Sequence, residues 1–196
     1  MKISFSAAGR KEKMHEDLIL EGKDILLKKA SFADWEDIYK NLWSHPESAV
    51  YMLWDPTFTK EEARARMERT LAFQQREKYS FFVYEKQRGK AIGFAAMKEI
   101  ESGIFDVMGI ALGPAFAGRG LGKQVLELLI REAFEKAGAE SFLASCRTEN
   151  LPSHFLQRKC GLVFSGFEDR TDPETGASYR LENNVLTRER YLFLKS

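Results

Sequence analysis

The chain contains 196 residues, of which 44% are hydrophobic and 30% are charged. This composition suits one globular domain and excludes a mainly disordered chain. The 30 basic and 29 acidic residues leave a net charge of +1, whereas a protein that binds nucleic acid through its overall field is usually far more basic. No apolar run approaches the roughly 18–20 residues of a spanning helix, which excludes a transmembrane protein.

The two cysteines, Cys146 and Cys160, are too few for a disulfide framework and predict a cytoplasmic protein. The first 20 residues lack a hydrophobic period and lack the apolar segment of a signal peptide. We therefore expect an N-terminal extension over residues 1–20, in which Met14 is an alternative start, followed by one domain over residues 21–196. We expect no nucleic-acid partner and no membrane partner.

Hydrophobic periodicity predicts alternating strands and helices in the first half of the chain. Residues 24–29 are expected to form a short strand, and Ser31 stands at the N-cap position of a helix. The apolar stretch 51–56 ends in a proline and predicts a short helical turn that enters a loop. Thr59 then opens a capping box, and a stripe of apolar residues at four-residue intervals predicts a helix to about residue 77.

Three strands are predicted in the middle of the chain. Residues 80–85 and 90–97 flank a turn and predict a hairpin, and a third strand follows at 105–112. A glycine-rich loop joins that strand to the most clearly amphipathic helix, which ends at Gly138. Residues 141–146 are expected to form a buried strand.

The last part of the chain is expected to contain one helix and a β-rich tail. Asn150 is the expected N-cap of the helix, with Leu151, Phe155 and Leu156 pointing to the core. Strands are expected at 162–167, 178–181 and 185–193. The order of these elements predicts one α/β domain with a mixed sheet.

The loop of residues 113–123 carries the clearest chemical signal. Gly118, Gly120 and Gly122 stand at alternate positions between a strand and a long helix. This spacing lets the backbone turn tightly, and the first N–H groups of the helix have no internal partners and lie at its positive end. The loop therefore predicts phosphate or pyrophosphate binding.

The spacing of this loop excludes two familiar nucleotide-binding motifs. The dinucleotide fingerprint requires its third glycine one residue later than Gly122. The P-loop requires four residues between its glycines and a Ser or Thr after the Lys, where this chain has Gln124. The remaining alternative is a tight turn that uses glycine only for close packing.

The order strand, P-x-x-x-G-x-G-x-G, helix, strand, Asn-x-x-Ser and Lys-x-Gly resembles the GCN5-related N-acetyltransferase (GNAT) family. The resemblance extends over about residues 24–194. The segments ILLKKASFADWEDIYK and YMLWDPTFTKEEA are similar to the branch that acetylates ribosomal-protein N-termini. The resemblance implies a mixed, largely antiparallel central sheet flanked by helices, with two strands that splay apart at the cofactor site.

The resemblance also implies acetyl-CoA as co-substrate. By position, its pantetheine arm would contact the backbone of Ile110, Ala111 and Leu112, where one N–H would polarise the thioester carbonyl, and Gly109 would ease a bulge. The pyrophosphate would lie on backbone N–H groups of Gly118, Arg119, Gly120, Leu121, Gly122 and Lys123. Asn150 resembles the family asparagine that contacts pantetheine. The chain departs from the pattern at Ala117, where the family carries Arg or Gln.

The residues that would transfer protons are less clearly indicated. The positions of the usual family Tyr and Glu hold Gln157 and Ser145. The resemblance to the ribosomal-protein branch implies Ser153 as a donor to the departing thiolate and Asp172 as a carboxylate base. Both residues also suit plain capping and turn positions.

Several other residues are weaker candidates for the site. Asp106 and Glu99 are placed where they would attract a cationic amine, and Trp54 is placed in the wall of an acceptor pocket. Cys146, His154 and Cys160 lack any recognised zinc spacing, so we expect no metal.

These features predict an acetyl-CoA-dependent N-acetyltransferase that acts by direct attack in a ternary complex. The acceptor is a primary amine, either a peptide N-terminus or a small molecule. One alternative is a non-catalytic CoA-binding module, because the usual Tyr and Glu are missing. Another is a phosphate-binding β–α protein unrelated to CoA. A monomer and a homodimer are both compatible with the sequence.

Overall fold

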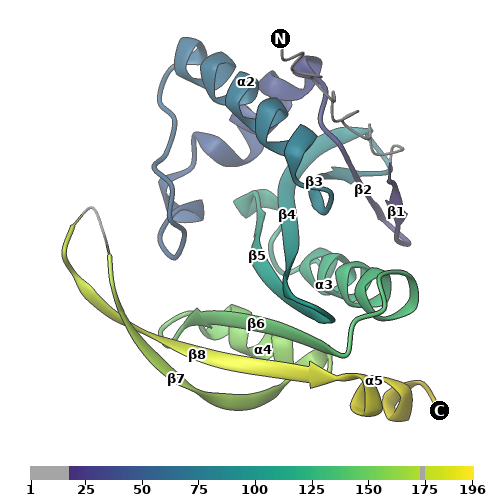
Figure 1. Ribbon diagram of the computed structural model, residues 1–196. Coiled ribbons are helices and arrows are strands. Elements are labelled where there is room, and N and C mark those ends of the chain that lie inside the picture. Colours follow the sequence, from purple (N-terminus) through teal and green to yellow (C-terminus); the bar gives the residue numbers. More distant parts are fainter. Residues whose placement is uncertain (1–17, 173–174) are drawn as a thin grey trace, which may run out of the picture.

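The computed structural model describes residues 18–172 and 175–196, so Met14 and most of the expected extension lie outside the described residues. The described part contains one eight-stranded sheet with the spatial order β1-β2-β3-β4-β5-β6-β8-β7 (Figure 1). The strands are β1 Leu20–Glu21, β2 Ile25–Lys28, β3 Ser80–Glu85, β4 Lys90–Glu101, β5 Ile104–Leu112, β6 Ser141–Arg147, β7 Val163–Thr171 and β8 Ser178–Thr187. Neighbouring strands are antiparallel except β5 and β6, which are parallel.

Helices cover both faces of this sheet. They are α1 Trp35–Ile38, α2 Lys60–Arg76, α3 Leu121–Arg131, α4 Leu151–Lys159 and α5 Arg188–Lys195. The turns Phe32–Asp34 and Tyr39–Trp43 extend α1 at its two ends, and the turn Glu132–Lys136 extends α3. Short 3-10 turns lie at Pro46–Ser48 and Pro114–Phe116.

The core consists of two apolar clusters, one on each face of the sheet. On one face, α3 packs its buried stripe against β2 to β6. On the other face, α1 and α2 bury residues such as Ile38, Leu42 and Met67 against Phe82 and Tyr84 of β3. Because both faces of the central strands are covered, β3 is buried along its whole length.

The parallel pair β5 and β6 separates soon after it begins. Hydrogen-bonded register joins only Ile104–Asp106 to Ser141–Leu143, although β5 continues to Leu112 and β6 to Arg147. Just past this point, the register of β5 against β4 shifts between Val107 and Gly109, and Gly109 has a φ of +153°. The predicted splay and the predicted bulge at Gly109 are therefore both present.

Two sequence predictions for the C-terminal part are wrong. Leu151 and Phe155 do not point to the core, because α4 instead turns His154 and Gln157 toward β8 and leaves both apolar residues exposed. The predicted last strand ends at Thr187, whose hydroxyl accepts the N–H of Arg190 and begins helix α5.

Two predictions in the first half of the chain also need correction. Residues 51–56 form no helical turn. A 3-10 turn lies earlier instead, at Pro46–Ser48. Strand β4 runs on to Glu101, beyond the predicted end at residue 97, because it continues to pair with β5.

No helix among the residues that the structure describes is long and apolar enough to cross a membrane.

Candidate active site

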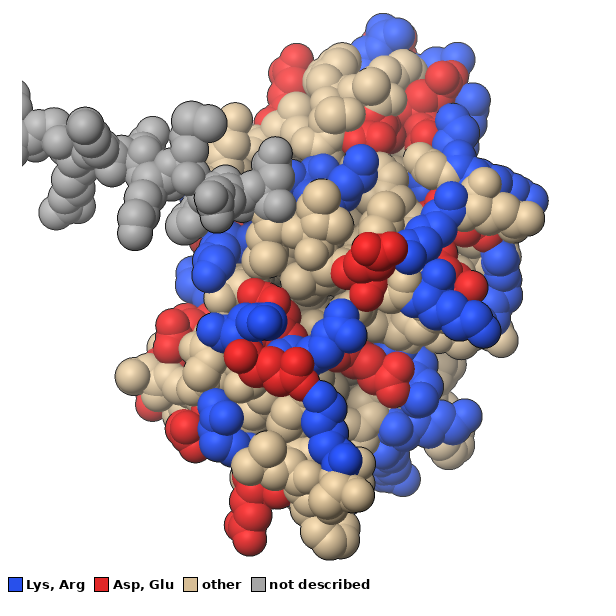
Figure 2. Space-filling model, turned by 90° about the vertical axis from the view of Figure 1, so that its right-hand side faces the viewer, with Lys and Arg blue, Asp and Glu red and all other residues tan. Residues whose placement is uncertain are grey.

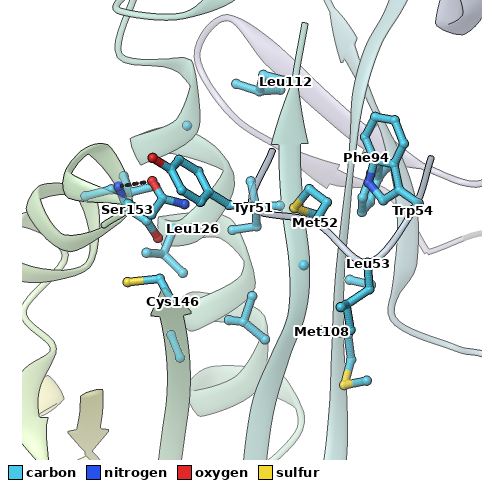
Figure 3. Close-up of a pocket in the computed structure, with 18 of the residues that line it drawn as sticks. Tyr51, Met52, Leu53, Trp54, Phe94, Met108, Leu112, Leu126, Cys146 and Ser153 are labelled. Atoms are coloured by element: carbon cyan, nitrogen blue, oxygen red, sulfur yellow. Dashed lines mark hydrogen bonds between the residues drawn. The ribbon is translucent and has the colours of Figure 1, made fainter. Parts of the chain in front are cut away.

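A cavity of about 1530 Å³ opens where β5 and β6 separate (Figure 3). Its wall comes from β4, β5, β6, the glycine-rich loop, α2, α4 and the segment of residues 51–58. Typical pockets for small ligands enclose about 300–1,000 Å³, so this space suits a longer ligand or two ligands side by side.

The free edge of β5 forms one wall of the cavity. Gly113 donates its N–H to the carbonyl of Ile92 at 2.8 Å. Hydrogen-bonded and non-hydrogen-bonded pairs alternate along an antiparallel ladder. The N–H of Ala111 is therefore directed to β4, whereas the N–H groups of Ile110 and Leu112 are directed to the gap between β5 and β6. Ile110 and Leu112 line the cavity. The gap therefore exposes two residues of unpaired strand edge.

The glycine-rich loop ends at the N-terminus of α3. Gly118 and Gly120 have φ values of +72° and +76°, a conformation that favours glycine. The first bond inside the helix runs from the N–H of Gln124 to the carbonyl of Gly120, and no side chain caps the helix. The N–H groups of Leu121, Gly122 and Lys123 thus have no partner within the helix. An anion at this point of the cavity would find both these donors and the positive end of the helix dipole.

The two cations of this loop have different roles. Arg119 donates to the buried carboxylate of Glu85 at 2.7 Å and is not among the residues that line the cavity. Lys123 does line the cavity, and its hydrogen bond to Glu127 at 2.9 Å raises the pKa of its amine. Arg119 therefore ties the loop to β3, and Lys123 is the loop's charged group at the cavity.

Asn150 and Ser153 stand at the start of α4, on the opposite side of the gap. The side-chain oxygen of Asn150 accepts the N–H of Ser153 at 3.2 Å, which confirms the predicted N-cap. The hydroxyl oxygen of Ser153 accepts a hydrogen bond from the side chain of Gln157 at 3.1 Å. Figure 3 shows Ser153 and Cys146 together on one side of β5, with Tyr51 reaching toward them.

Two of the three carboxylates expected at the site, Asp172 and Glu99, are not among the residues that line the cavity. Asp172 accepts the N–H of Thr175 at 3.0 Å at the β7–β8 turn, lies 3.8 Å from Arg147, and does not line the cavity. Glu99 is exposed and accepts the N–H of Gly103 at 2.9 Å. Neither is placed at the free edge of β5.

Asp106 is the carboxylate of β5 that lines the cavity. Burial raises the pKa of Asp106, against the lowering effects of a backbone hydrogen bond from Val107 and the charge of Arg170. A carboxylate with a raised pKa is a better proton acceptor than an ordinary one. The structure therefore favours Asp106 over the other two carboxylates as a group that meets a cationic ligand.

The far end of the cavity is apolar and aromatic. Large side chains line it although they remain exposed in part: Leu53, Phe58, Phe73 and Met108 are 74%, 69%, 44% and 57% exposed. Trp54 and Phe94 both line the cavity, and the role of Trp54 as a wall of an acceptor pocket stays a prediction. Exposed apolar groups clustered in a hollow are typical of a binding surface.

Arg66 contacts two tryptophans at this end, and no pattern in the sequence indicates this contact. Its guanidinium lies between the rings of Trp43 and Trp54, at 4.7 and 4.5 Å from their centres, and donates to Thr57 at 2.9 Å. Burial lowers the pKa of Arg66 to about 10, which leaves it charged at neutral pH. Only the tertiary structure brings Arg66 of α2 to the two tryptophans.

The face of the molecule on the right-hand side of Figure 1 carries charges of both signs. Figure 2 shows Lys and Arg interspersed with Asp and Glu over the face it presents, without a patch of one sign. Within residues 18–172 and 175–196, no three His, Cys, Asp or Glu side chains are grouped closely enough to hold a metal ion.

Comparison with known proteins gives consistent matches. The family model described as "Acetyltransferase (GNAT) domain" matches residues 24–163. A curated relative, the uncharacterised N-acetyltransferase YnaD of Bacillus subtilis, is 20% identical over 152 residues, which are 78% of this chain and 86% of that protein.

Two solved structures share the fold. A GCN5-related N-acetyltransferase from Brucella melitensis matches with a TM-score of 0.79 and 20% identity over 93% of this chain and 84% of that chain. RimL, described as a ribosomal L7/L12 alpha-N-protein acetyltransferase in complex with coenzyme A, matches with a TM-score of 0.70 and 17% identity over 87% of this chain and 98% of that chain.

Proposed function

The chain belongs to the GNAT acetyltransferase family and is an N-acetyltransferase, and on this premise we propose that it moves the acetyl group of acetyl-CoA to a primary amine by direct attack in a ternary complex. One observation carries the proposal. The unpaired edge of β5 opens directly onto the uncapped N-terminus of α3, within one cavity that continues to an apolar end.

The glycine-rich loop and the edge of β5 divide the co-substrate between them. We assign the pyrophosphate to the backbone N–H groups around Gly118, Gly120 and Gly122, with Lys123 adding charge. The pantetheine arm is assigned to the edge of β5 at Ile110 and Leu112, where it would add like a strand. RimL, which shares this fold, is described in complex with coenzyme A, and this supports coenzyme A as the ligand of the fold.

The acetyl group then lies between the β5 edge and the start of α4. The N–H of Ile110 or Leu112 polarises the thioester carbonyl, because a donor fixed at a developing oxyanion lowers the barrier. Ser153, across the gap, donates a hydrogen bond to the departing sulfur. Asp106 attracts the amine and takes its proton as the new C–N bond forms and the C–S bond breaks.

The acceptor is proposed to be a primary amine on an apolar group. The exposed side chains of Leu53, Phe58 and Phe73 around Trp54 favour such a group, because its burial removes apolar surface from water. Basic residues outnumber acidic ones among the charged residues that line the cavity, which are Arg66, Arg69, Lys123, Arg147, Lys159, Arg170, Asp55, Glu62 and Asp106. A polycation therefore gains no net attraction here. Small amines and peptide N-termini with apolar first residues both fit the description.

A thermal-shift titration tests the co-substrate. Acetyl-CoA or CoA at a hundred times its dissociation constant should raise the melting temperature by roughly 5–10 °C, whereas ATP and NAD should not. A cooperative transition that neither acetyl-CoA nor CoA shifts would contradict the proposal.

The release of the CoA thiol with a panel of amines tests the acceptor. We expect turnover with 2-phenylethylamine and with a peptide that begins with an apolar residue, and little with spermidine. A preference for spermidine would contradict the proposed acceptor class and leave the acetyl transfer itself intact.

A further inference from the structure

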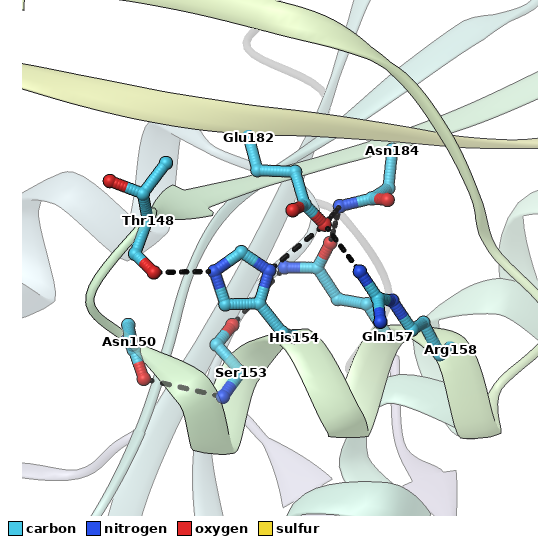
Figure 4. A network of polar contacts seen from close by, with 8 residues as sticks. All are labelled: Thr148, Asn150, Ser153, His154, Gln157, Arg158, Glu182 and Asn184. Carbon is cyan, nitrogen blue, oxygen red and sulfur yellow. Dashed lines mark hydrogen bonds and ion pairs between the residues drawn. The ribbon is translucent and has the colours of Figure 1, made fainter.

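Between α4 and β8, a network of buried polar side chains connects β8 to Ser153 (Figure 4). Its members are His154, Gln157, Glu182 and Asn184, each less than 9% exposed. Buried polar groups are costly unless they are hydrogen-bonded. The acetyl-transfer roles assigned above use none of these four residues, so their arrangement asks for a separate explanation.

The network begins at the carboxylate of Glu182, which determines the donor and the acceptor of each hydrogen bond after it. Burial alone would raise the pKa of Glu182, but hydrogen bonds from His154 and Asn184 and the charge of Arg158 lower it overall. An ionised carboxylate only accepts hydrogen bonds. The Asn184 group that faces Glu182 at 3.2 Å is therefore its NH₂.

The orientation of Asn184 determines the orientation of the Gln157 side chain. The NH₂ of Asn184 also faces Gln157 at 2.9 Å, so the facing atom of Gln157 is its carbonyl oxygen. The NH₂ of Gln157 must then point to Ser153, at 3.1 Å from the hydroxyl oxygen. Ser153 accepts this bond, which leaves its single hydrogen free to point elsewhere.

Ser145 provides a contrast within the same cavity. It also lines the wall, but its hydroxyl donates to the side-chain oxygen of Asn183 at 2.7 Å. The hydrogen of Ser145 is therefore occupied by an oxygen acceptor, whereas the hydroxyl of Ser153 meets the thiol of Cys146, a weak acceptor that a ligand sulfur can replace. Burial raises the pKa of this thiol against the lowering effect of its hydrogen bonds with Ser153 and Gln157, so the thiol stays neutral and does not compete as an anion.

We propose that Gln157, held by Asn184 and Glu182, is a positioning residue that keeps the hydroxyl hydrogen of Ser153 directed at the departing sulfur of CoA. This inference rests on the proposed function. When the amine nitrogen bonds to the acetyl carbon and the C–S electron pair leaves with sulfur, Ser153 donates a hydrogen bond to the thiolate and the amine proton leaves to Asp106. The N–H of Gln157 stabilises the charge that this donation draws onto the Ser153 oxygen.

The substitution Gln157→Glu reverses the direction of the hydrogen bond to Ser153. The introduced carboxylate accepts from Ser153 and turns its hydrogen away from the cavity, while Asn184 still donates to the new side chain. We expect kcat to fall about tenfold or more, with the affinity for acetyl-CoA nearly unchanged. Ser153→Ala should cause a similar loss, whereas the control substitution Gln87→Glu, on an exposed turn, should keep the parent rate.

The pH profile separates positioning from a purely structural role. The introduced carboxyl would face Asn184 and Glu182 of β8, Cys146 of β6, and Ser153, His154 and Arg158 of α4. Burial and the charge of Glu182 raise its pKa. As the pH falls, its protonated form donates to Ser153 again, so the ratio of variant to parent kcat should rise. The ratio of Ser153→Ala to parent should stay flat.

A second variant keeps the test valid if Gln157→Glu fails to fold. Gln157→Met removes the donor without adding charge, and it should lower kcat in the parent but not in the Ser153→Ala background. Equal loss in both backgrounds, or an unchanged kcat for Gln157→Glu at every pH, would overturn the inference. A parent protein that binds no acetyl-CoA and transfers no acetyl group would instead overturn the proposed function.

Discussion

At the scale of single residues, the glycines of the loop make the most specific demands on the backbone. Gly120 has a φ of +76°, and a Cβ built there would meet no atom within 4 Å. The protein's own packing therefore leaves room for a side chain at this position. The need for glycine comes from the backbone conformation and, in our account, from the ligand that approaches it.

Gly138 offers a matched control for Gly120. It has a φ of +77° and equally open surroundings, but it follows the helix of the loop rather than preceding it. Gly120→Ala and Gly138→Ala should each cost about 1 kcal/mol of unfolding free energy. Only Gly120→Ala should weaken acetyl-CoA binding, as measured by calorimetry. Equal affinities in the two variants would remove Gly120 from the phosphate site.

Asp106 is expected to link activity and stability in opposite directions. Because its folded pKa is raised, the folded state binds more protons than the unfolded state between the ordinary and the raised pKa, and stability falls as pH rises through this window. Asp106→Asn should remove this loss, so its melting temperature should match or exceed that of the parent at neutral pH. Its kcat/KM for the amine should fall and lose the acidic limb that the parent shows.

The result that would count against this role of Asp106 is an unchanged kcat/KM. A parent profile without an acidic limb would count against it as well. Asp172→Asn is the comparison variant, because Asp172 lies at the hairpin turn and not in the cavity wall. We expect it to leave kcat/KM close to the parent value.

At the scale of elements, α2 and the segment of residues 51–58 build the acceptor end. Phe73 of α2 lines the cavity and is 44% exposed, whereas Phe193 of α5 is 75% exposed and lies outside the cavity. Phe73→Ala should raise KM for apolar amines several-fold, because a phenyl contact is lost. Phe193→Ala should leave KM unchanged, and the affinity for acetyl-CoA should be the same in both variants. An equal KM in the two variants would contradict the acceptor assignment.

Local patterns predicted most of these elements. The strand at Ser80–Glu85, the helix capped by Thr59 and the glycine-rich loop all appear where the periodicity and the capping residues indicate. Helix α4 is the informative failure. Its buried residues are His154 and Gln157, because β8 faces it with Glu182 and Asn184. A polar stripe that is buried against another polar stripe leaves no apolar period to detect.

The site was predictable to the same extent. The loop and the N-cap of α4 have local sequence signals, so their place at the cavity could be expected. Arg66 has none, because its two tryptophan partners come from other parts of the chain. Asp172 was predicted from the family resemblance, which gives no direction for the hairpin, and the structure places Asp172 outside the cavity wall.

At the scale of the whole molecule, function depends on a sheet that opens in its middle. Strands β5 and β6 are joined by only three paired residues on each strand and then diverge (Figure 1). A sheet edge is normally at the outside of a fold, where it invites pairing with another chain. Here the edge lies inside, between two halves that each have their own helices, and the central claim is that acetyl-CoA pairs with it.

Residue-resolved amide hydrogen exchange with and without saturating acetyl-CoA tests this claim most directly. We expect the amides of Ile110 and Leu112 to be strongly protected by the ligand, because they face the gap. The amide of Ala111 should change little, because it already faces β4. Saturating acetyl-CoA that leaves Ile110 and Leu112 exchanging as before would contradict the account.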